Sequence, residues 1–482
     1  MAVDYNAFAT GDIAAALAMM NLTHGRQPIL TEVTEITDEN IIDVLNKAVS
    51  AFAQNRDECQ WLYDYYRGIQ PILHRQKTER PEICNKVVEN RAYEIVTFKT
   101  GRFLYKDIQY TNRSDKTLSE VDELNRMMYA EGKAGKDREL VDWFHITGAG
   151  YRLVVTDKGD SPFHIYSVDP RRAFVVYADT VEKQPMMGVY VTTIENRDKT
   201  KTTIYTAYTK KYVYQVKSGE ETWFSKKPHI LGDVPLIEYP LNMARLGCFE
   251  IVVSLLNAIN NAQSNRLDGV EQFIQALLVF KGFKVDENQV TQLRQQGAIC
   301  LPQGMDMEYL TKELNQSQVQ TLVDDLYQAV LTICGMPNRN GGSSTSDNKG
   351  AVVLRDGWSA AATAVKETKQ YFEQSERRML SMVLRVFNIY RDKVAPKREP
   401  LLLSDIDIHF DEGEYENMLE KVQSLTMLLA NPYVHPKFAY EVSNITTDPE
   451  AAYIAGMKWH DERAEAEVAE MDKVTTEDNT DV

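Results

Sequence analysis

An alternating run near position 405 contains the residue types that bind divalent metal ions. Asp405, Asp407, His409 and Asp411 alternate with isoleucine and phenylalanine. In a β-strand, side chains two residues apart point to the same face, so these four could hold a cation for a metal-dependent nuclease. A half-buried strand with its apolar residues inward and its polar residues in solvent explains the same pattern. This second interpretation accounts for every residue, so neither a metal nor another cofactor is predicted.

The motifs that catalyse nucleotide hydrolysis or acyl transfer are missing from the sequence. Residues 132–136 (GKAGK) lack the spacing of a phosphate-binding loop and the Ser or Thr that would hold Mg²⁺. No GxSxG, HExxH or HRD-type motif occurs. The sequence therefore predicts a protein that is not an enzyme.

A polar loop, residues 335–350, separates two long helical stretches. It reads GMPNRNGGSSTSDNKG and carries only Arg339, Asp347 and Lys349 as charged residues. Glycine, serine and asparagine populate many backbone conformations and bury little surface, so we expect this loop to be mobile. A compact domain seldom keeps so long a loop unless the loop is functional or disordered. The loop is therefore the first candidate for contact with a partner molecule.

Two other stretches could contact partners. Residues 63–80 mix tyrosines with basic residues and could touch phosphates, although a helix end followed by a solvated loop explains them better. Residues 249–280 form a helical pattern whose centre is too polar for the core of a monomer. Such a helix suits subunit contacts or the lining of a water-filled passage. Its candidate residues are Asn257, Asn260, Asn261, Asn265, Arg266 and Asp268.

Composition limits the class of protein. The 482 residues are enough for about three domains, and the formal charge of −16 is unlike that of a free nucleic-acid binder. An acidic chain could still line a passage through which a polyanion slides. The five cysteines form no CxxC pair, which predicts free thiols in a reducing compartment. With no secretory signal or apolar run of membrane length, we expect a soluble protein inside a cell and no membrane partner.

The positioning elements follow from hydrophobic periodicity and turn signals. Helices are predicted at 38–52, 56–66, 81–98, 117–131 and 137–146. An antiparallel sheet is predicted between 150 and 240, with strands at 151–156, 163–168, 173–177, 188–195, 202–209 and 212–216. A helix is predicted next, at 249–280, followed by strands at 297–302 and 304–310. The rest of the chain is predicted to contain helices at 317–334 and 351–390, a strand at 401–410 and further helices from 414. This order predicts an α+β protein with a small domain inserted between two long helices.

From about residue 30 to 460, the chain resembles the portal protein of tailed double-stranded DNA phages, in the branch found in siphophages of Gram-positive hosts. The order and spacing of five motifs carry the resemblance. These motifs are 64–73 (DYYRGIQPIL), 86–91 (KVVENR), 96–101 (VTFKTG), 169–177 (DPRRAFVVY) and 277–282 (LLVFKG).

The resemblance implies the division of a portal subunit. An N-terminal arm (1–29) precedes a wing (30–246), two stem helices (247–280 and 315–334) enclose a clip (281–314), and a tunnel loop follows (335–350). After the loop come a long ring-crossing helix with the next strand (351–411), a crown (412–460) and an acidic, disordered tail (461–482). The implied tunnel-loop contacts to DNA are Asn338, Arg339, Asn340, Gly341, Gly342, Ser343, Ser344, Asp347, Asn348 and Lys349.

The resemblance also implies a function. Such proteins form rings of twelve subunits at one capsid vertex of the virion, after assembly in the host cytoplasm. The ring passes DNA during packaging and ejection, and it binds the terminase large subunit, head-completion or adaptor proteins, the major capsid protein and scaffolding protein. The alternatives are another head–tail adaptor or minor capsid protein, the metal-dependent nuclease, and a cytosolic scaffold unrelated to DNA. Adaptors are usually much shorter, which disfavours the first alternative.

Overall fold

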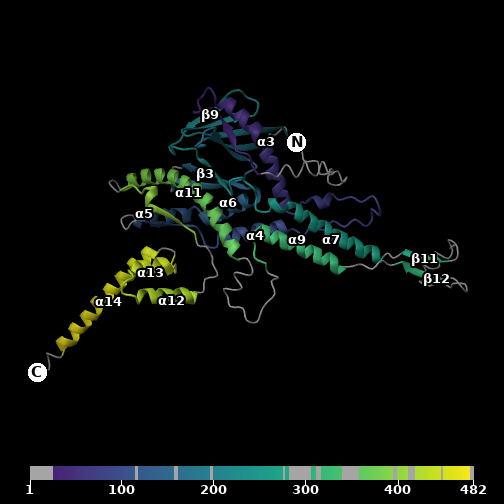
Figure 1. Cartoon of the computed structure of the whole chain (residues 1–482). Helices are drawn as coiled ribbons and strands as arrows, with labels where there is room; N and C mark the ends of the chain where they lie inside the picture. The colour runs from purple at the N-terminus through teal and green to yellow at the C-terminus, as the bar shows by residue number, and fades with distance from the viewer. Residues whose placement is uncertain are drawn as a thin grey trace.

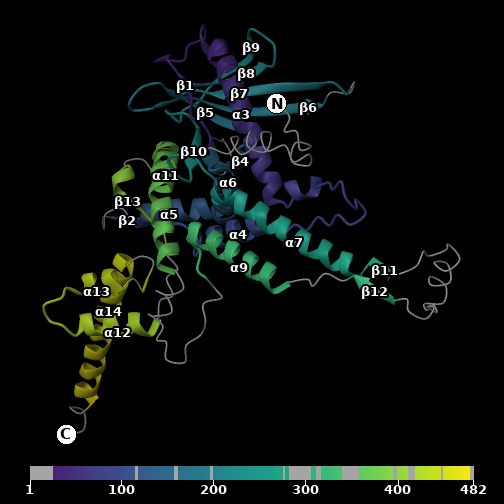
Figure 2. The same cartoon turned by 45° about the vertical axis from the view of Figure 1, so that its right-hand side comes forward.

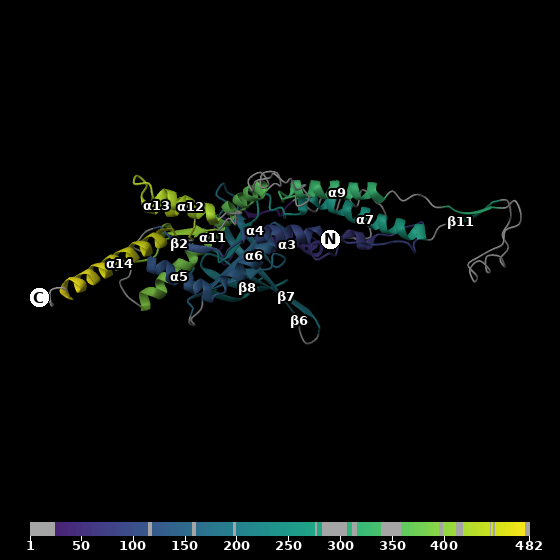
Figure 3. The same ribbon diagram turned by 90° about the horizontal axis from the view of Figure 1, so that it is seen from below.

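The computed structural model has an α+β fold and an elongated outline (Figure 1). It describes residues 25–113, 118–156, 161–195, 199–274, 277–281, 306–310, 316–338, 358–394, 399–410, 418–443, 445–446 and 449–477. A body of helices and sheets forms the centre. A pair of long helices projects from one side of this body and three C-terminal helices lie on the other, as Figure 3 also shows.

A six-stranded sheet forms the outer part of the body. Its strands, in spatial order, are β1 (Ile29–Thr31), β5 (Ala173–Ala178), β6 (Pro185–Glu195), β7 (Lys201–Tyr208), β8 (Tyr212–Lys217) and β9 (Trp223–Pro228). Neighbouring strands are antiparallel, except that β1 runs parallel to β5. Helix α3 (Ile41–Tyr66) covers one face, where Phe52 stacks on Phe174 with ring centroids 4.4 Å apart.

The prediction of a single antiparallel sheet is wrong, because the strands form two sheets. A three-stranded sheet has the order β10 (Leu236–Pro240), β3 (Ala149–Thr156) and β4 (Phe163–Val168). All six strands predicted between 151 and 216 occur, with small differences at their ends. Strands β9 and β10 were missed, since β9 is rich in lysine and both strands contain proline, which is rare inside strands.

Helix α3 joins two helices that the sequence predicted separately, at 38–52 and 56–66. Asn55 lies at the expected break and is buried. Its side chain accepts the backbone N–H of Gln27 at 3.0 Å and donates to the carbonyl of Gln27 at 2.8 Å. Because the amide is satisfied by the segment before β1, it does not compete with the helix backbone and the helix continues.

The helix predicted at 81–98 begins ten residues later. Helix α4 runs from Arg91 to Phe103, and the side chain of Asn90 caps it by accepting the N–H of Tyr93 at 3.4 Å. Residues 81–90 contain no helix. Ile83 and Val87 are four residues apart, which imitates helical spacing in a segment that has no regular secondary structure.

The central core lies where helices meet the three-stranded sheet. Helices α5 (Leu118–Ala130) and α6 (Lys133–Thr147) confirm the predictions at 117–131 and 137–146. Helix α11 (Trp358–Val394) crosses the body beside them, and the start of the predicted helix at 351 lies outside the described residues (Figure 2). The ring of Phe103 packs edge-on against Phe144 and Phe372, at centroid distances of 5.6 and 5.3 Å.

A short two-stranded sheet joins the end of the body to its beginning. Strand β13 (Ile406–His409) pairs antiparallel with β2 (Gln109–Asn112), which the sequence did not predict. The first part of the strand predicted at 401–410 is instead a 3₁₀ turn, η4 (Leu403–Asp405). Ile406 is fully buried against the central core.

The projecting pair consists of α7 (Val253–Ile274) and α9 (Gln316–Ile333), which lie side by side (Figures 1 and 2). A 3₁₀ turn, η3 (Glu250–Val252), leads into α7. The helix predicted to reach 280 ends at Ile274, because the apolar residues after it form strand β11 (Leu277–Lys281), paired with β12 (Asp306–Leu310). A short apolar run fits either structure, so periodicity could not decide between them. The strand predicted at 297–302 lies outside the described residues.

The C-terminal part contains helices α12 (Met418–Leu429), α13 (Pro436–Ser443) and α14 (Pro449–Glu477). The prediction that the acidic tail from 461 is disordered is wrong as far as Glu477, since α14 continues to that residue. Glutamate and alanine are frequent in this segment and have high helix propensity, which favours the helix.

A buried ionic network fixes α11 to the body. The carboxylate of Glu376 pairs with Arg152 and Lys133, both at 3.0 Å, and accepts the hydroxyls of Tyr110 and Tyr239, both at 2.7 Å. Burial alone would raise the pKa of this carboxyl, but the two cations and two hydroxyls outweigh burial and lower the pKa to about 2. One glutamate therefore connects α11 to β2, α6, β3 and β10.

Replacing Glu376 with alanine should lower the free energy of unfolding by roughly 3–5 kcal/mol, since the buried cations Arg152 and Lys133 would keep only one shared carboxylate, that of Asp137. Urea unfolding followed by circular dichroism measures this loss. Gln374→Ala is the control, because Gln374 is exposed on the same helix and should change the value by less than about 0.5 kcal/mol. A loss below about 1 kcal/mol for Glu376→Ala would contradict the proposed anchoring role.

Candidate functional site

A strap, residues 75–90, lies along the polar face of α7; it turns at 80–83 and has no regular secondary structure from 84 to 90. It follows a 3₁₀ turn, η1 (Pro71–His74). Backbone N–H groups of alternate strap residues donate to side chains one helical turn apart: Asn85 to Asp268 (2.7 Å), Val87 to Ser264 (3.0 Å) and Glu89 to Asn260 (2.8 Å). Two extended residues advance by about 6.6 Å and four helical residues by about 6 Å, so the two periods match.

Asp268 is the most connected residue in this contact. Its carboxylate is nearly inaccessible to solvent and pairs with Lys77 at 2.8 Å and with Arg75 at 3.1 Å. Burial would raise the pKa of this carboxyl, but the hydrogen bonds from Lys77 and Asn85 outweigh it and lower the pKa. Asp268 is therefore charged at neutral pH and holds the strap by both charge and hydrogen bonds.

The predicted channel-lining role is wrong for Asn260 and Asp268, because both are buried within their own chain. Asn257 accepts the hydroxyl of Tyr65 at 3.0 Å, and Arg266 donates to Gln320 of α9 at 2.5 Å. Asn265 accepts a hydrogen bond from Arg75 but is exposed, and Asn261 is exposed as well. For Asn261 and Asn265 a role at a subunit contact or channel stays a prediction.

Replacing Asp268 with alanine should release the strap from α7. Its partners Arg75 and Lys77 are partly exposed, so we expect a loss of about 2 kcal/mol rather than the full cost of breaking a buried pair. Hydrogen exchange should quicken at the amides of residues 83–89. Asn261→Ala is the control on the exposed side of the same helix, and equal exchange in the two variants would contradict this arrangement.

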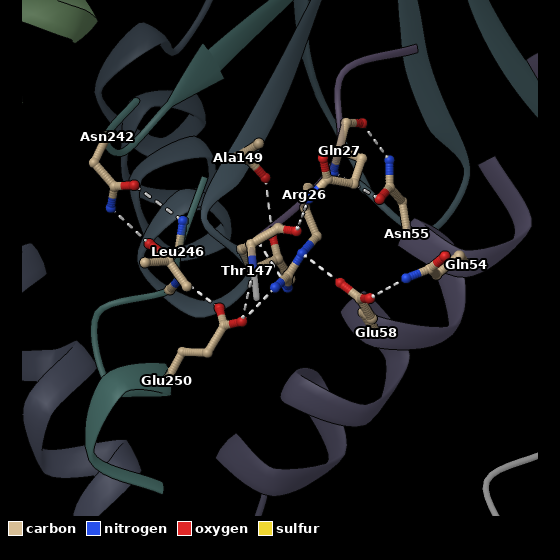
Figure 4. Close-up of polar contacts among 12 residues, drawn as sticks. Arg26, Gln27, Gln54, Asn55, Glu58, Thr147, Ala149, Asn242, Leu246 and Glu250 are labelled. Carbon is tan, nitrogen blue, oxygen red and sulfur yellow. Dashed lines mark hydrogen bonds and ion pairs between the residues drawn. The ribbon is translucent and has the colours of Figure 1, made fainter. Parts of the chain in front are cut away.

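Arg26 ties the root of the helix pair to the body (Figure 4). This buried side chain pairs with Glu58 of α3 at 3.1 Å and with Glu250 of η3 at 2.5 Å, and donates to the carbonyl of Thr147 at 3.3 Å. Glu250 also accepts the N–H of Gly247 at 2.8 Å. From the sequence, residues 1–29 were expected to form only an N-terminal arm. The ion pair of Arg26 could not be predicted, because its partner Glu250 lies more than 200 positions away.

Helix α4 supports both ends of the segment that joins α9 to α11. The guanidinium of Arg91 lies 4.0 Å from the ring centroid of Tyr327 on α9, whose hydroxyl donates to Glu94 at 2.9 Å. Further along α4, Phe98 packs against Trp358, the first residue of α11, with a centroid distance of 6.2 Å. Helix α4 therefore contacts both α9 and α11.

A cavity of about 290 Å³ opens beside α4 at the end of α9. It is lined by Arg91, Glu94, Phe98, Tyr327, Leu331, Met336, Pro337 and Asn338. Of the ten predicted tunnel-loop residues, only Asn338 is described, and it lies at this cavity, partly buried. The other nine, from Arg339 to Lys349, lie outside the described residues, so their contact with DNA stays a prediction.

His145 connects α4, α6 and the helix pair at the same root. Its ring nitrogen Nδ1 lies 3.2 Å from the hydroxyl of Thr100, and its carbonyl accepts the N–H of Cys248 at 2.8 Å. Burial and then the positive charge of Lys99 lower the pKa of His145 to about 3. Cys334 donates weakly to the carbonyl of Cys248 at 3.7 Å, and burial raises the pKa of both thiols, which keeps them unreactive.

The four described cysteines, Cys59, Cys84, Cys248 and Cys334, are free, as predicted, and Cys300 lies outside the described residues. No described helix is long and apolar enough to cross a membrane.

The depressed pKa of His145 predicts a stability that depends on pH. An unfolded histidine binds a proton below about pH 6.5 and the folded one only near pH 3, so acid favours the unfolded chain. When the pH falls from 7.5 to 5, the free energy of unfolding of the wild type should decrease by about 2 kcal/mol more than that of His145→Gln. Urea titrations across this range provide the measurement. His460→Gln, with an exposed ring, should follow the wild type; parallel curves for all three proteins would refute the prediction.

The places of Asp405 and Asp407 count against the metal-binding alternative for the alternating run. Asp405 belongs to η4, where its carboxylate accepts the N–H of Leu402 at 2.9 Å, and Asp407 pairs with Arg113 at 3.0 Å and with Arg377 at 3.6 Å. Asp411 lies outside the described residues, and His409 is partly buried in β13. Within the part of the chain that the structure describes, no group of His, Cys, Asp and Glu side chains could hold a metal ion.

Comparison with known proteins identifies one family. The family model described as "Phage portal protein, SPP1 Gp6-like" matches residues 45–480. No curated protein matches the chain.

Among solved structures, a similar chain occurs in the neck of an empty GTA particle computed with C6 symmetry; the identity is 11%, the match covers 73% of this chain and 90% of that chain, and the TM-score is 0.39. A second occurs in the neck of a native GTA particle computed with C12 symmetry; the identity is 12%, the match covers 77% of this chain and 94% of that chain, and the TM-score is 0.38. A third occurs in the virion of a native gene transfer agent particle; the identity is 11%, the match covers 81% of this chain and 94% of that chain, and the TM-score is 0.39. These identities and TM-scores are too low to support a functional assignment.

Proposed function

We propose that this chain, which belongs to the SPP1 Gp6-like family of phage portal proteins, forms a ring around a channel for double-stranded DNA. The family match confirms the resemblance to phage portal proteins, which are virion components, and the host branch stays a prediction. Twelve copies are expected from that resemblance, placed at one capsid vertex after assembly in the host cytoplasm. The ring would pass DNA into the capsid during packaging and out of it during ejection.

The projecting pair of α7 and α9 is the observation that carries this proposal. In a ring, the pair from each copy would form the stem, and strands β11 and β12 would belong to the clip at its far end. The Arg26 network and the strap make the pair a stiff extension of the body, as the wall of a channel requires. Because the strap covers the row of Asn260, Ser264 and Asp268, other surfaces of the pair would face the neighbouring copies and the DNA.

The chemistry of the channel follows from charge. A formal charge of −16 on each copy gives the ring a field that repels DNA phosphates and opposes sticking. Arg339 and Lys349 would add two sparse rings of positive charge where the tunnel loop meets the duplex. The loop would therefore touch DNA loosely, and it would position the duplex or hinder back-slip rather than read its sequence.

The partners would be divided between the two ends of the ring. The clip end of the stem would bind the terminase large subunit during packaging and head-completion or adaptor proteins afterwards. The wing and crown would face the major capsid and scaffolding proteins. The chain itself would not be an enzyme, because the terminase motor would hydrolyse ATP and the candidate metal residue Asp407 is engaged with two arginines.

Mass photometry and particle imaging of the purified full chain test the ring directly. We expect closed rings with a mass near twelve chains, and a central channel wide enough for a duplex. A monomer or dimer that persists across salt concentrations would count against the proposal. DNA cleavage in Mg²⁺ or Mn²⁺ that disappears in Asp407→Ala would replace the portal assignment with the nuclease alternative.

A further inference from the structure

The three C-terminal helices have almost no hydrophobic core of their own. Of the described residues between 421 and 459, Ala439 and Ser443 alone are buried. Nine large apolar side chains in this segment are exposed instead: Val422, Met427, Leu429, Tyr433, Phe438, Val442, Ile454, Met457 and Trp459. We call residues 418–459 the crown unit.

The exposed apolar surface is large for a monomeric protein. Tyr433 is 96% exposed, Trp459 67% and Phe438 62%. An aromatic side chain buries about 150–250 Å² when covered, so these three alone expose on the order of 400 Å². A typical monomer's largest apolar patch is about 300–600 Å² and is often functional. With six further apolar residues exposed, the crown unit exceeds what solubility alone favours.

The body of the same chain does not cover this surface. Helix α13 packs against both α12 and α14, whereas no described helix or strand of the body makes more than slight contact with these three. Figures 1 and 2 show them as a separate group below α11. Within the part of the chain that the structure describes, no element of the body therefore covers these apolar residues.

Charge indicates what kind of molecule would cover this surface. Between residues 418 and 460 the sequence has four acidic residues and three lysines, in a chain whose formal charge is −16. A surface for DNA would be basic, and a surface for a strongly charged protein would carry the opposite charge. The crown unit is nearly neutral and apolar, and its exposed residues come from all three helices. A ring gives each copy two neighbours and therefore needs two apolar faces, which fits this distribution.

We propose that the crown unit is a self-association element that gains its hydrophobic core only when neighbouring copies of this chain meet. This inference rests on the proposed ring and goes beyond it, because a ring could equally be held by stem and wing alone. The apolar side chains of one copy would then form the missing core of the next. The crown would be loosely packed in a free subunit and firmly packed in the assembly.

Hydrogen exchange on the full chain, in ring and monomer fractions separated by size, tests this inference. We expect amides of residues 418–443 to exchange at least tenfold more slowly in the ring, whereas amides in β3 and β10 should be equally protected in both. Equal protection of the crown unit in the two fractions would overturn the inference and leave the ring intact. Absence of any ring by mass would overturn the proposed function as well.

The double variant Phe438→Ser/Trp459→Ser provides the matched test. Either its rings should lack crown protection, or rings should fail to form while β3 and β10 stay protected. Tyr129→Ser on α5, which removes an 88% exposed aromatic side chain from the body, should leave ring formation and crown protection unchanged. Rings of the double variant with full crown protection would refute self-association through these side chains.

Discussion

The buried carboxylate of Glu376 determines where α11 lies, and much of the body is arranged around it. Taking a charge out of water costs several kcal/mol, so Glu376 is tolerable only because Arg152, Lys133 and two tyrosine hydroxyls reach it together. These partners come from four elements that are distant in sequence. Their positions cannot change independently, because moving any one of them would leave a charge or hydroxyl unpaired in the core. The fold is therefore specified at this point by polar geometry as well as by apolar packing.

The projecting helix pair depends on the same kind of constraint at its root. Arg26 and Glu250 form a second buried ion pair, and the strap adds a row of backbone N–H donors that match the side chains of α7. A lone antiparallel helix pair buries only one stripe on each helix and would bend easily. Here α7 is supported on a second side by the strap, which makes the pair a rigid extension of the body. In a portal ring, that rigidity would let the stem keep a constant bore while DNA passes through it.

Local sequence patterns predicted much of the fold, and the exceptions have physical reasons. Alternation within a strand is a property of neighbouring residues, so the strands between 151 and 216 and helix α5 could be found without a structure. Strands β2 and β10 are defined by partners far along the chain, and the end of α7 depends on whether Leu277–Lys281 meets β12. The polar row of α7 was visible in the sequence, but its partners are backbone N–H groups, which leave no sequence signal. The spacing of Asn260, Ser264 and Asp268 could have indicated that a single segment binds them.

The distribution of cores suggests how stability is divided between the chain and its assembly. The body holds the apolar clusters and the buried ion pairs within one copy. The crown unit lies outside these clusters and leaves its large side chains in solvent. A subunit built in this way would be stable enough to exist before assembly, yet its outer part would gain order from each neighbour. Because an apolar core shared between copies forms only when the neighbours are correctly placed, closure of the ring would stabilise the crown more than any partial assembly could.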